Sequence, residues 1–112
     1  EEETAERWAK KLCLSNVVDS FELNDDYSII EAKVPSDYIG KTVREVGFRR
    51  EFNLLVLTII KKVEVKSIVG KSKIETQIQG VASADNQLEA DDILVLYGSN
   101  KDLQIFLKQK LR

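Results

Sequence analysis

Two pairs of adjacent aspartates are the side chains best suited to hold a metal ion: Asp25-Asp26 and Asp91-Asp92. Hard divalent cations prefer oxygen ligands, and carboxylates supply them. Each pair, however, directly precedes a predicted strand, and aspartates in that position usually form turns. Neither pair has the spacing of a calcium-binding loop. We therefore interpret both pairs as turn residues and expect no metal site.

Three arginines, Arg44, Arg49 and Arg50, lie close together in the sequence. A guanidinium group binds phosphate or carboxylate through two parallel hydrogen bonds, so a small anionic ligand or an acidic partner could bind at this segment. Glu45 and Glu51 favour the opposite interpretation, a solvated surface whose charges neutralise one another. The two interpretations differ in one respect, because a ligand site requires the arginines to converge.

Histidine is absent, and its absence excludes several classes of enzyme. Without imidazole the chain has no Ser-His or Cys-His nucleophile pair and no histidine-ligated zinc. Its glycines form neither a dinucleotide-binding motif nor a P-loop. We therefore expect a non-enzymatic domain that holds no cofactor of its own.

Charge and hydropathy also limit the partners of the chain. The formal net charge is -2 and the pI is about 5.2, so we expect no nucleic-acid partner. A single cysteine, Cys13, cannot form an intramolecular disulfide, which favours a reducing compartment. The longest apolar runs, residues 54–60 and 93–97, have the length of strands. The acidic residues 1–3 differ from the basic start of an export signal. We expect a cytoplasmic domain without direct membrane insertion.

The 112 residues correspond to one domain, and its first half has three recognisable segments. Apolar side chains recur with helical spacing over residues 5–13. Residues 27–34 alternate between apolar and polar side chains, which predicts a half-buried strand. Thr42 and Glu45 have the spacing of a capping box, so we expect a short helix that starts here and ends near residue 52.

The second half is richer in strands. The apolar run over residues 54–60 predicts a central strand covered on both faces. Two alternating segments, 63–66 and 74–78, predict a hairpin. Residues 93–97 predict a further buried strand, and Ser99-Asn100 predicts the cap of a last helix. The lysines of this half are expected to point outward and protect the sheet edges: Lys61, Lys62, Lys66, Lys71 and Lys73.

This order of elements predicts the α+β class. We expect a small, mostly antiparallel β-sheet with helices packed on one face, preceded by a linker helix. The face without helices would remain partly apolar, and such faces of small domains are commonly covered by another subunit. We therefore expect a homodimer.

Residues 31–59, EAKVPSDYIGKTVREVGFRREFNLLVLTI, resemble the start of the RCK C-terminal domain, also called the TrkA-C domain. The shared features are the strand ending in Val-Pro, the Ile-Gly-Lys-Thr-Val-Arg-Glu helix start and the Arg-Arg-x-Phe exit into an apolar strand. Residues 88–98, LEADDILVLYG, are similar to a later segment of the same family. Asn53 and Asp91 stand where the family usually has glycine, and both residue types tolerate left-handed backbone.

Residues before this region are similar to the linker of cytosolic Trk and Ktr subunits, which joins a nucleotide-binding Rossmann lobe to the C-terminal lobe. The resemblance therefore implies two parts, a linker helix and connection over residues 1–20 and an RCK C-terminal regulatory domain over residues 21–112. A nucleotide cofactor would bind the separate Rossmann lobe.

The resemblance implies a regulatory domain of a potassium uptake system that forms homodimers and acts on a membrane potassium transporter subunit through the full-length protein. In some members the dimer interface binds cyclic di-AMP. Carried over by position, that ligand site would include Val43, Arg44, Arg49 and Leu55. Leu55 replaces an asparagine that hydrogen-bonds the nucleotide in the binding members. The alternative is a purely structural dimerisation module of another cation transporter or antiporter, without a ligand.

Overall fold

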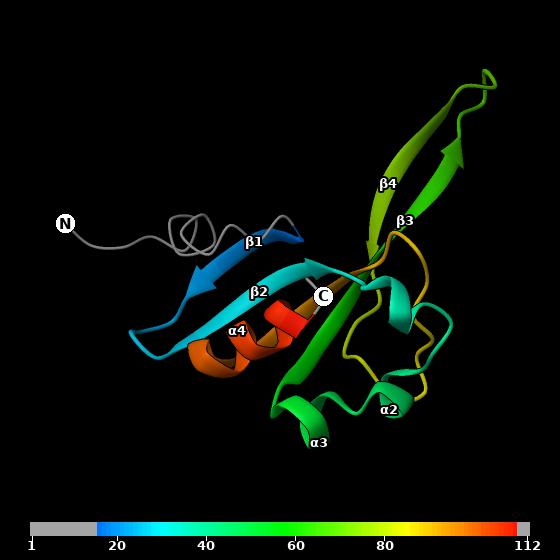
Figure 1. Ribbon diagram of the computed structural model, residues 1–112. Coiled ribbons are helices and arrows are strands. Elements are labelled where there is room, and N and C mark those ends of the chain that lie inside the picture. The colour runs from blue at the N-terminus through cyan, green and yellow to red at the C-terminus, as the bar shows by residue number, and fades with distance from the viewer. Residues whose placement is uncertain (1–15, 110–112) are drawn as a thin grey trace.

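The computed structural model describes residues 16–109, so the predicted linker helix over residues 5–13 lies outside the described part. Five strands form one antiparallel sheet in the order β1-β2-β5-β3-β4 (Figure 1). Their bounds are β1 Val17–Glu22, β2 Tyr27–Lys33, β3 Leu55–Lys66, β4 Ser72–Ile78 and β5 Ile93–Ser99. The strand β5, although last in sequence, lies at the centre because it pairs with both β2 and β3.

Within the described residues, four helical segments accompany the sheet. They are the 3-10 helix η1 Ser36–Tyr38 and the α-helices α2 Val43–Val46, α3 Phe48–Phe52 and α4 Asn100–Gln109. One buried apolar cluster joins the inner face of the sheet to α2, α3 and α4. Phe106 of α4 contacts the rings of Phe48 and Phe52, with centroids 5.7 and 5.1 Å apart. The predicted α+β class is confirmed.

Strand β2 shows why these residues form a half-buried strand. Ser28, Ile30 and Ala32 are buried toward the helices, whereas Tyr27 and Lys33 are exposed on the opposite face. The alternation matches the period of two that places successive side chains on opposite faces. The prediction for residues 27–34 is therefore confirmed.

The segment expected to form one helix from Thr42 to about residue 52 forms two. Gly47 adopts a left-handed conformation, with φ of 71°, and its N–H donates to the carbonyl of Val43. This conformation ends α2, and α3 begins one residue later. A side chain with a Cβ rarely adopts it, so glycine permits the break. The capping box at the start is present: Thr42 Oγ1 accepts from the Glu45 N–H and Glu45 Oε1 accepts from the Thr42 N–H.

The strand β3 is longer than expected. Residues 55–60 of the apolar run and the segment 63–66 belong to the same strand of 12 residues, and Leu54 directly precedes it. The expectation that residues 54–60 are covered on both faces is wrong, because Leu55 remains 46% exposed. Beyond Ile60, β3 pairs only with β4, and together they form a hairpin that projects from the body of the molecule (Figure 1). We call residues 61–77 the hairpin arm.

The predicted linker and connection, residues 1–20, overlap the first four residues of β1. Strand β1 lies at one edge of the sheet and pairs with β2 over Val17 to Glu22. The expected division after residue 20 therefore falls within a strand. The sequence pattern of β1 is weak because its pairing with β2 shifts register between Val17 and Asp19. This shift interrupts the alternation of side chains that would identify a strand.

The outer face of the sheet, opposite the helices, carries one row of apolar side chains. Phe21, Ile29, Tyr97 and Leu55 are directly opposite one another on four adjacent strands. Phe21 and Leu55 are each 46% exposed. We call these four residues the outer row.

Candidate functional site

A pocket with a volume of about 300 Å³ lies at one end of the outer row, between the end of α3 and the start of α4. Its walls combine apolar, aromatic, amide and charged side chains. The lining residues are Tyr27, Arg49, Asn53, Leu55, Tyr97, Gly98, Ser99 and Asp102. They come from α3, the loop after it, three strands and α4, so only the folded chain brings them together.

Asn53 connects the two helices at this pocket. It caps α3 in a left-handed conformation with φ of 59°, and its N–H donates to the carbonyl of Arg49 at 3.1 Å. Its side-chain Nδ2 donates to Asp102 Oδ2 at 3.3 Å. Asp102 in turn donates its backbone N–H to Ser99 Oγ, which caps the first turn of α4 as predicted. These bonds hold the ends of α3 and α4 in fixed positions on either side of the pocket.

The opposite wall is apolar. The rings of Tyr27 and Tyr97 stack with centroids 6.0 Å apart and an interplanar angle of 15°. Leu55 lies beside Tyr97 in the outer row. Gly98 has no room for a larger side chain, because a Cβ at this residue would overlap Cδ2 of the fully buried Leu54. The wall can therefore contact a planar or apolar group.

Charge in the pocket is mixed. The exposed guanidinium of Arg49 forms no ion pair within residues 16–109, so it is available to an anionic group. Asp102 contributes a carboxylate of opposite sign to the same pocket. One cation beside one anion favours a ligand that is only partly anionic over a compact, highly charged one.

The structure brings together two of the four predicted site residues. Arg49 and Leu55 both line the pocket, whereas Val43 and Arg44 do not. Val43 packs half-buried against the core. The Arg44 guanidinium pairs instead with Asp85 at 2.6 Å, and both side chains are exposed.

The three arginines do not converge within one chain. Arg50 extends its guanidinium over Gly47, and its Nε lies 3.3 Å from Glu51 Oε2. Arg44 pairs with Asp85 of a different loop, and only Arg49 reaches the pocket. The solvated interpretation therefore holds for Arg44 and Arg50.

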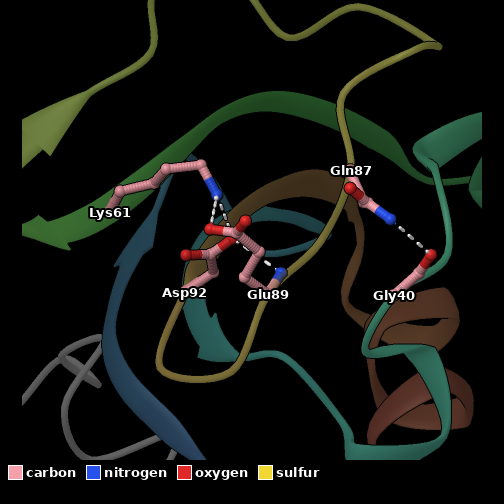
Figure 2. Close-up of polar contacts among 5 residues, drawn as sticks. All are labelled: Gly40, Lys61, Gln87, Glu89 and Asp92. Carbon is pink, nitrogen blue, oxygen red and sulfur yellow. Dashed lines mark hydrogen bonds and ion pairs between the residues drawn. The ribbon is translucent and has the colours of Figure 1, made fainter.

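A second polar cluster, shown in Figure 2, fixes the loop before β5. Lys61 Nζ lies 2.5 Å from Asp92 Oδ2 and 3.2 Å from Glu89 Oε1. The same Asp92 oxygen accepts the Glu89 N–H at 2.9 Å. The side chain of Lys61 is only 20% exposed, so the expectation that it points outward is wrong. A buried carboxylate needs a cation nearby, and Lys61 supplies it.

These contacts shift the titration of the lysine. Burial by itself would lower the pKa of Lys61, but the hydrogen bonds and negative charges of Asp92 and Glu89 outweigh burial and raise that pKa above its usual value. The loop is held at a second point, where Gln87 Nε2 donates to the carbonyl of Gly40 at 3.0 Å (Figure 2). The cluster is thus structural, and it positions the loop on which α2 rests.

The aspartate pairs serve the turns. Asn24 Oδ1 accepts from the N–H groups of Asp26 and Tyr27, which closes the turn before β2. Asp91 adopts a left-handed conformation with φ of 72°, as its residue type allows. Within residues 16–109 no three metal-ligating side chains form a cluster.

Sequence reasoning missed Tyr27, Asn53, Tyr97 and Asp102 as pocket residues. Tyr27 and Tyr97 occupy outward positions of alternating strands, which is a usable signal for exposure. That signal does not show that the two rings stack, because the pairing of β2 with β5 joins residues seventy positions apart. Asn53 was identified for its backbone only, and its contact with Asp102 depends on how α3 and α4 pack.

Comparison with known proteins provides one informative similarity. The chain is 28% identical over 111 residues to the Ktr system potassium uptake protein C of Bacillus subtilis. The aligned region covers 99% of this chain and 44% of that relative, so the chain spans less than half of the relative's length. No family model matches the chain. Among the described residues, none of the helices has the length and apolar character that crossing a membrane requires.

Proposed function

We propose that this chain is a non-catalytic regulatory lobe of a potassium uptake system. The similarity to the Ktr protein extends over nearly the whole chain and less than half of the relative, as expected for one lobe of a larger subunit. The resemblance to the RCK C-terminal domain supports the same assignment. In this proposal the lobe is cytoplasmic and acts on a membrane potassium transporter subunit through the rest of the full-length protein.

The outer row is the proposed dimer interface. Phe21 and Leu55 leave almost half of their surface in water, on a face that no helix of the described chain covers. A second copy that placed its own outer row against this one would bury the apolar surface of both copies. Because each pocket lies at one end of its row, the interface would place both pockets at its margin.

The pocket is the proposed sensing site, and Arg49 is the residue that carries this part of the proposal. Its guanidinium is exposed and lacks an ion pair in the described chain, so it can bind a phosphate or carboxylate. A ligand that binds one arrangement of the paired lobes better than another shifts the population toward it. The attached lobes would transmit that shift to the transporter.

A second candidate is a structural dimerisation module without a ligand. The dispersal of Arg44, Arg49 and Arg50 favours it, because a strong anion site would gather them. The carboxylate of Asp102 in the same pocket favours it as well.

A thermal-shift screen with adenine nucleotides and cyclic dinucleotides distinguishes the two candidates. A ligand bound only by the folded state raises the unfolding temperature as its concentration exceeds the dissociation constant. The regulatory proposal expects such a rise with one of these anions, and expects Arg49→Gln to abolish it. Arg50→Gln is the matched control, because its guanidinium is equally charged and lies outside the pocket. No rise with any anion, or an equal loss in both variants, favours the structural module.

A further inference from the structure

The hairpin arm is the part of the molecule that the proposed function does not explain. Every residue of β4 is exposed, so the arm contributes nothing to the buried core. A two-stranded ribbon without a packed face is only marginally stable in water. Residues 61–66 of β3 nevertheless extend past the rest of the sheet to form it.

The turn at the end of the arm has an unusual composition. The Gly70 N–H donates to the Ser67 carbonyl at 3.0 Å, which makes Ile68 and Val69 the central residues of a β-turn. The Ser67 N–H donates to the Lys71 carbonyl at 2.7 Å and closes the hairpin. Central turn positions usually hold Gly, Pro, Asn, Asp or Ser. Here two β-branched apolar side chains occupy them; Ile68 is fully exposed to water and Val69 is 78% exposed.

Positive charge surrounds this apolar tip. Residues 65–74 contain three lysines and no acidic residue. Lys66 lies opposite Ser72 on one face of the ribbon, Lys73 lies opposite Val65 on the other, and Lys71 belongs to the turn. Lys73 has a weak contact with Glu75 at 3.7 Å, and neither Lys66 nor Lys71 forms an ion pair within the described residues.

The arrangement of charge and apolar surface indicates the orientation of a partner. Because lysines occur on both faces of the ribbon, a flat partner on one face would leave part of the charge unmatched. A surface that meets the arm at its tip would contact Ile68 and Val69 first and all three lysines around them. The arm projects from the body, so the tip can reach an extended surface without obstruction by the sheet (Figure 1).

We infer that the tip of the hairpin arm binds the surface of an anionic lipid bilayer. Ile68 and Val69 enter the headgroup layer, and the ammonium groups of Lys66, Lys71 and Lys73 lie against the lipid phosphates. Stable membrane attachment usually requires two signals, and here an apolar insertion and a basic cluster occur together. Each lysine near an anionic surface strengthens binding by about fivefold. This contact is peripheral, and it adds to the contact through a transporter that we expected from the sequence.

Vesicle co-sedimentation of the 112-residue chain tests the inference. The probes are vesicles of phosphatidylcholine alone and of phosphatidylcholine with about 30% phosphatidylglycerol, at about 0.1 M salt, where surface charge is only partly screened. We expect binding to the anionic vesicles that weakens as the salt concentration rises. The double variant Ile68→Ser, Val69→Ser should bind the anionic vesicles at least tenfold more weakly. The triple variant Lys66→Gln, Lys71→Gln, Lys73→Gln should bind them about a hundredfold more weakly.

The matched control removes the same charge elsewhere, with Lys33→Gln, Lys41→Gln and Lys101→Gln, three exposed lysines outside the arm. Equal loss of binding in this control, or no binding of the unmodified chain to anionic vesicles, overturns the inference. Equal binding to neutral vesicles rejects the role of the lysines. An increase in the molecular mass of the purified chain that depends on the tip residues and needs no lipid would assign the tip to contact between copies of this chain instead. None of the replaced side chains is buried, so we expect every variant to fold. A cooperative thermal unfolding transition checks this for each variant.

Discussion

Lys61 shows how one side chain can differ in role from its neighbours of the same type. It is flanked by Lys62, which is exposed as expected, yet Lys61 itself points toward Asp92 and Glu89. The Asp92 side chain is 4% exposed, so its carboxylate depends on the ammonium group for compensation. The pair therefore anchors the loop before β5 to the middle of β3.

Replacing Lys61 with methionine should lower the free energy of unfolding by about 2–4 kcal/mol, because it leaves a buried carboxylate without its cation. Lys62→Met, at the adjacent and exposed residue, should change the free energy of unfolding by less than about 0.5 kcal/mol. Chemical denaturation measures both values. Similar losses in the two variants would show that the contact with Asp92 contributes no net stability.

The same pair should make stability depend on alkaline pH. The pKa of Lys61 is raised in the folded state, so its contribution is complete below the unfolded pKa and disappears as the pH rises through the folded pKa. Burial and the charges of Asp37 and Glu51 also raise the pKa of Tyr38, whose ionisation destabilises the fold in the same range. The difference between the unmodified chain and Lys61→Met isolates the lysine. That difference should be constant near neutral pH and shrink above pH about 10; a constant difference up to pH 12 would contradict the assignment.

Leu55 determines the expected response to cyclic di-AMP, the ligand of some members of the family that the sequence resembles. Leucine offers no donor or acceptor, so a polar atom of the ligand buried against it loses a partner, at a cost of about 1–3 kcal/mol. We expect weak or absent binding by isothermal titration. Leu55→Asn should increase the affinity for cyclic di-AMP at least tenfold. Phe21→Asn should leave this affinity unchanged, although Phe21 is equally exposed in the outer row. Submicromolar binding by the unmodified chain would show that the contact lies elsewhere.

At the level of elements, the break at Gly47 makes α2 unusually dependent on its cap. The helix has four residues, and both reciprocal bonds of the Thr42-Glu45 capping box are present. An isolated turn of helix is unstable because nucleation fixes several residues for one bond. Capping therefore provides a large part of the local stability of α2.

Thr42→Ala should lower the free energy of unfolding by about 0.5–2 kcal/mol, since the Glu45 N–H loses its acceptor. Thr76→Ala on the exposed strand β4 is the control and should have little effect on global unfolding. Denaturant midpoints of the two variants provide the comparison. An unchanged midpoint for Thr42→Ala would mean that other contacts, such as the bond from the Val43 N–H to the Asn86 carbonyl, suffice.

For the whole molecule, the distribution of apolar surface is the main consequence of the topology. The helices cover one face of the sheet, and the outer row lies on the other. Exposed apolar surface of this kind on a small domain usually marks an interface.

Light scattering should therefore report a homodimer at high micromolar concentration. Leu55→Asp should shift it toward monomer, because the interface would bury two unpaired carboxylates. Ile105→Asp is the control, since Ile105 is 50% exposed but lies on α4, away from the outer row. A monomeric mass for the unmodified chain would contradict the proposed interface.

Local signals in the sequence determined much of this fold. The alternation of β2, the capping box of Thr42 and the left-handed residues Asn53 and Asp91 each depend on neighbours within a few positions, and the structure contains all of them. The α+β class follows from the order of such elements. The helix break at Gly47 also depends on a single residue. It is not evident from the sequence, because the helical spacing of the side chains continues on both sides of Gly47.

Tertiary structure decided the pocket and the role of Lys61. Arg49 and Leu55 were identified from the sequence, yet their partners Tyr97 and Asp102 come from β5 and α4, more than forty positions later. The direction of Lys61 depends on Asp92, thirty-one positions away, and an alternating pattern shows only which residues share a face. Strand register and helix packing select the contacts between distant residues, because these contacts form only when the buried surfaces of several elements fit together.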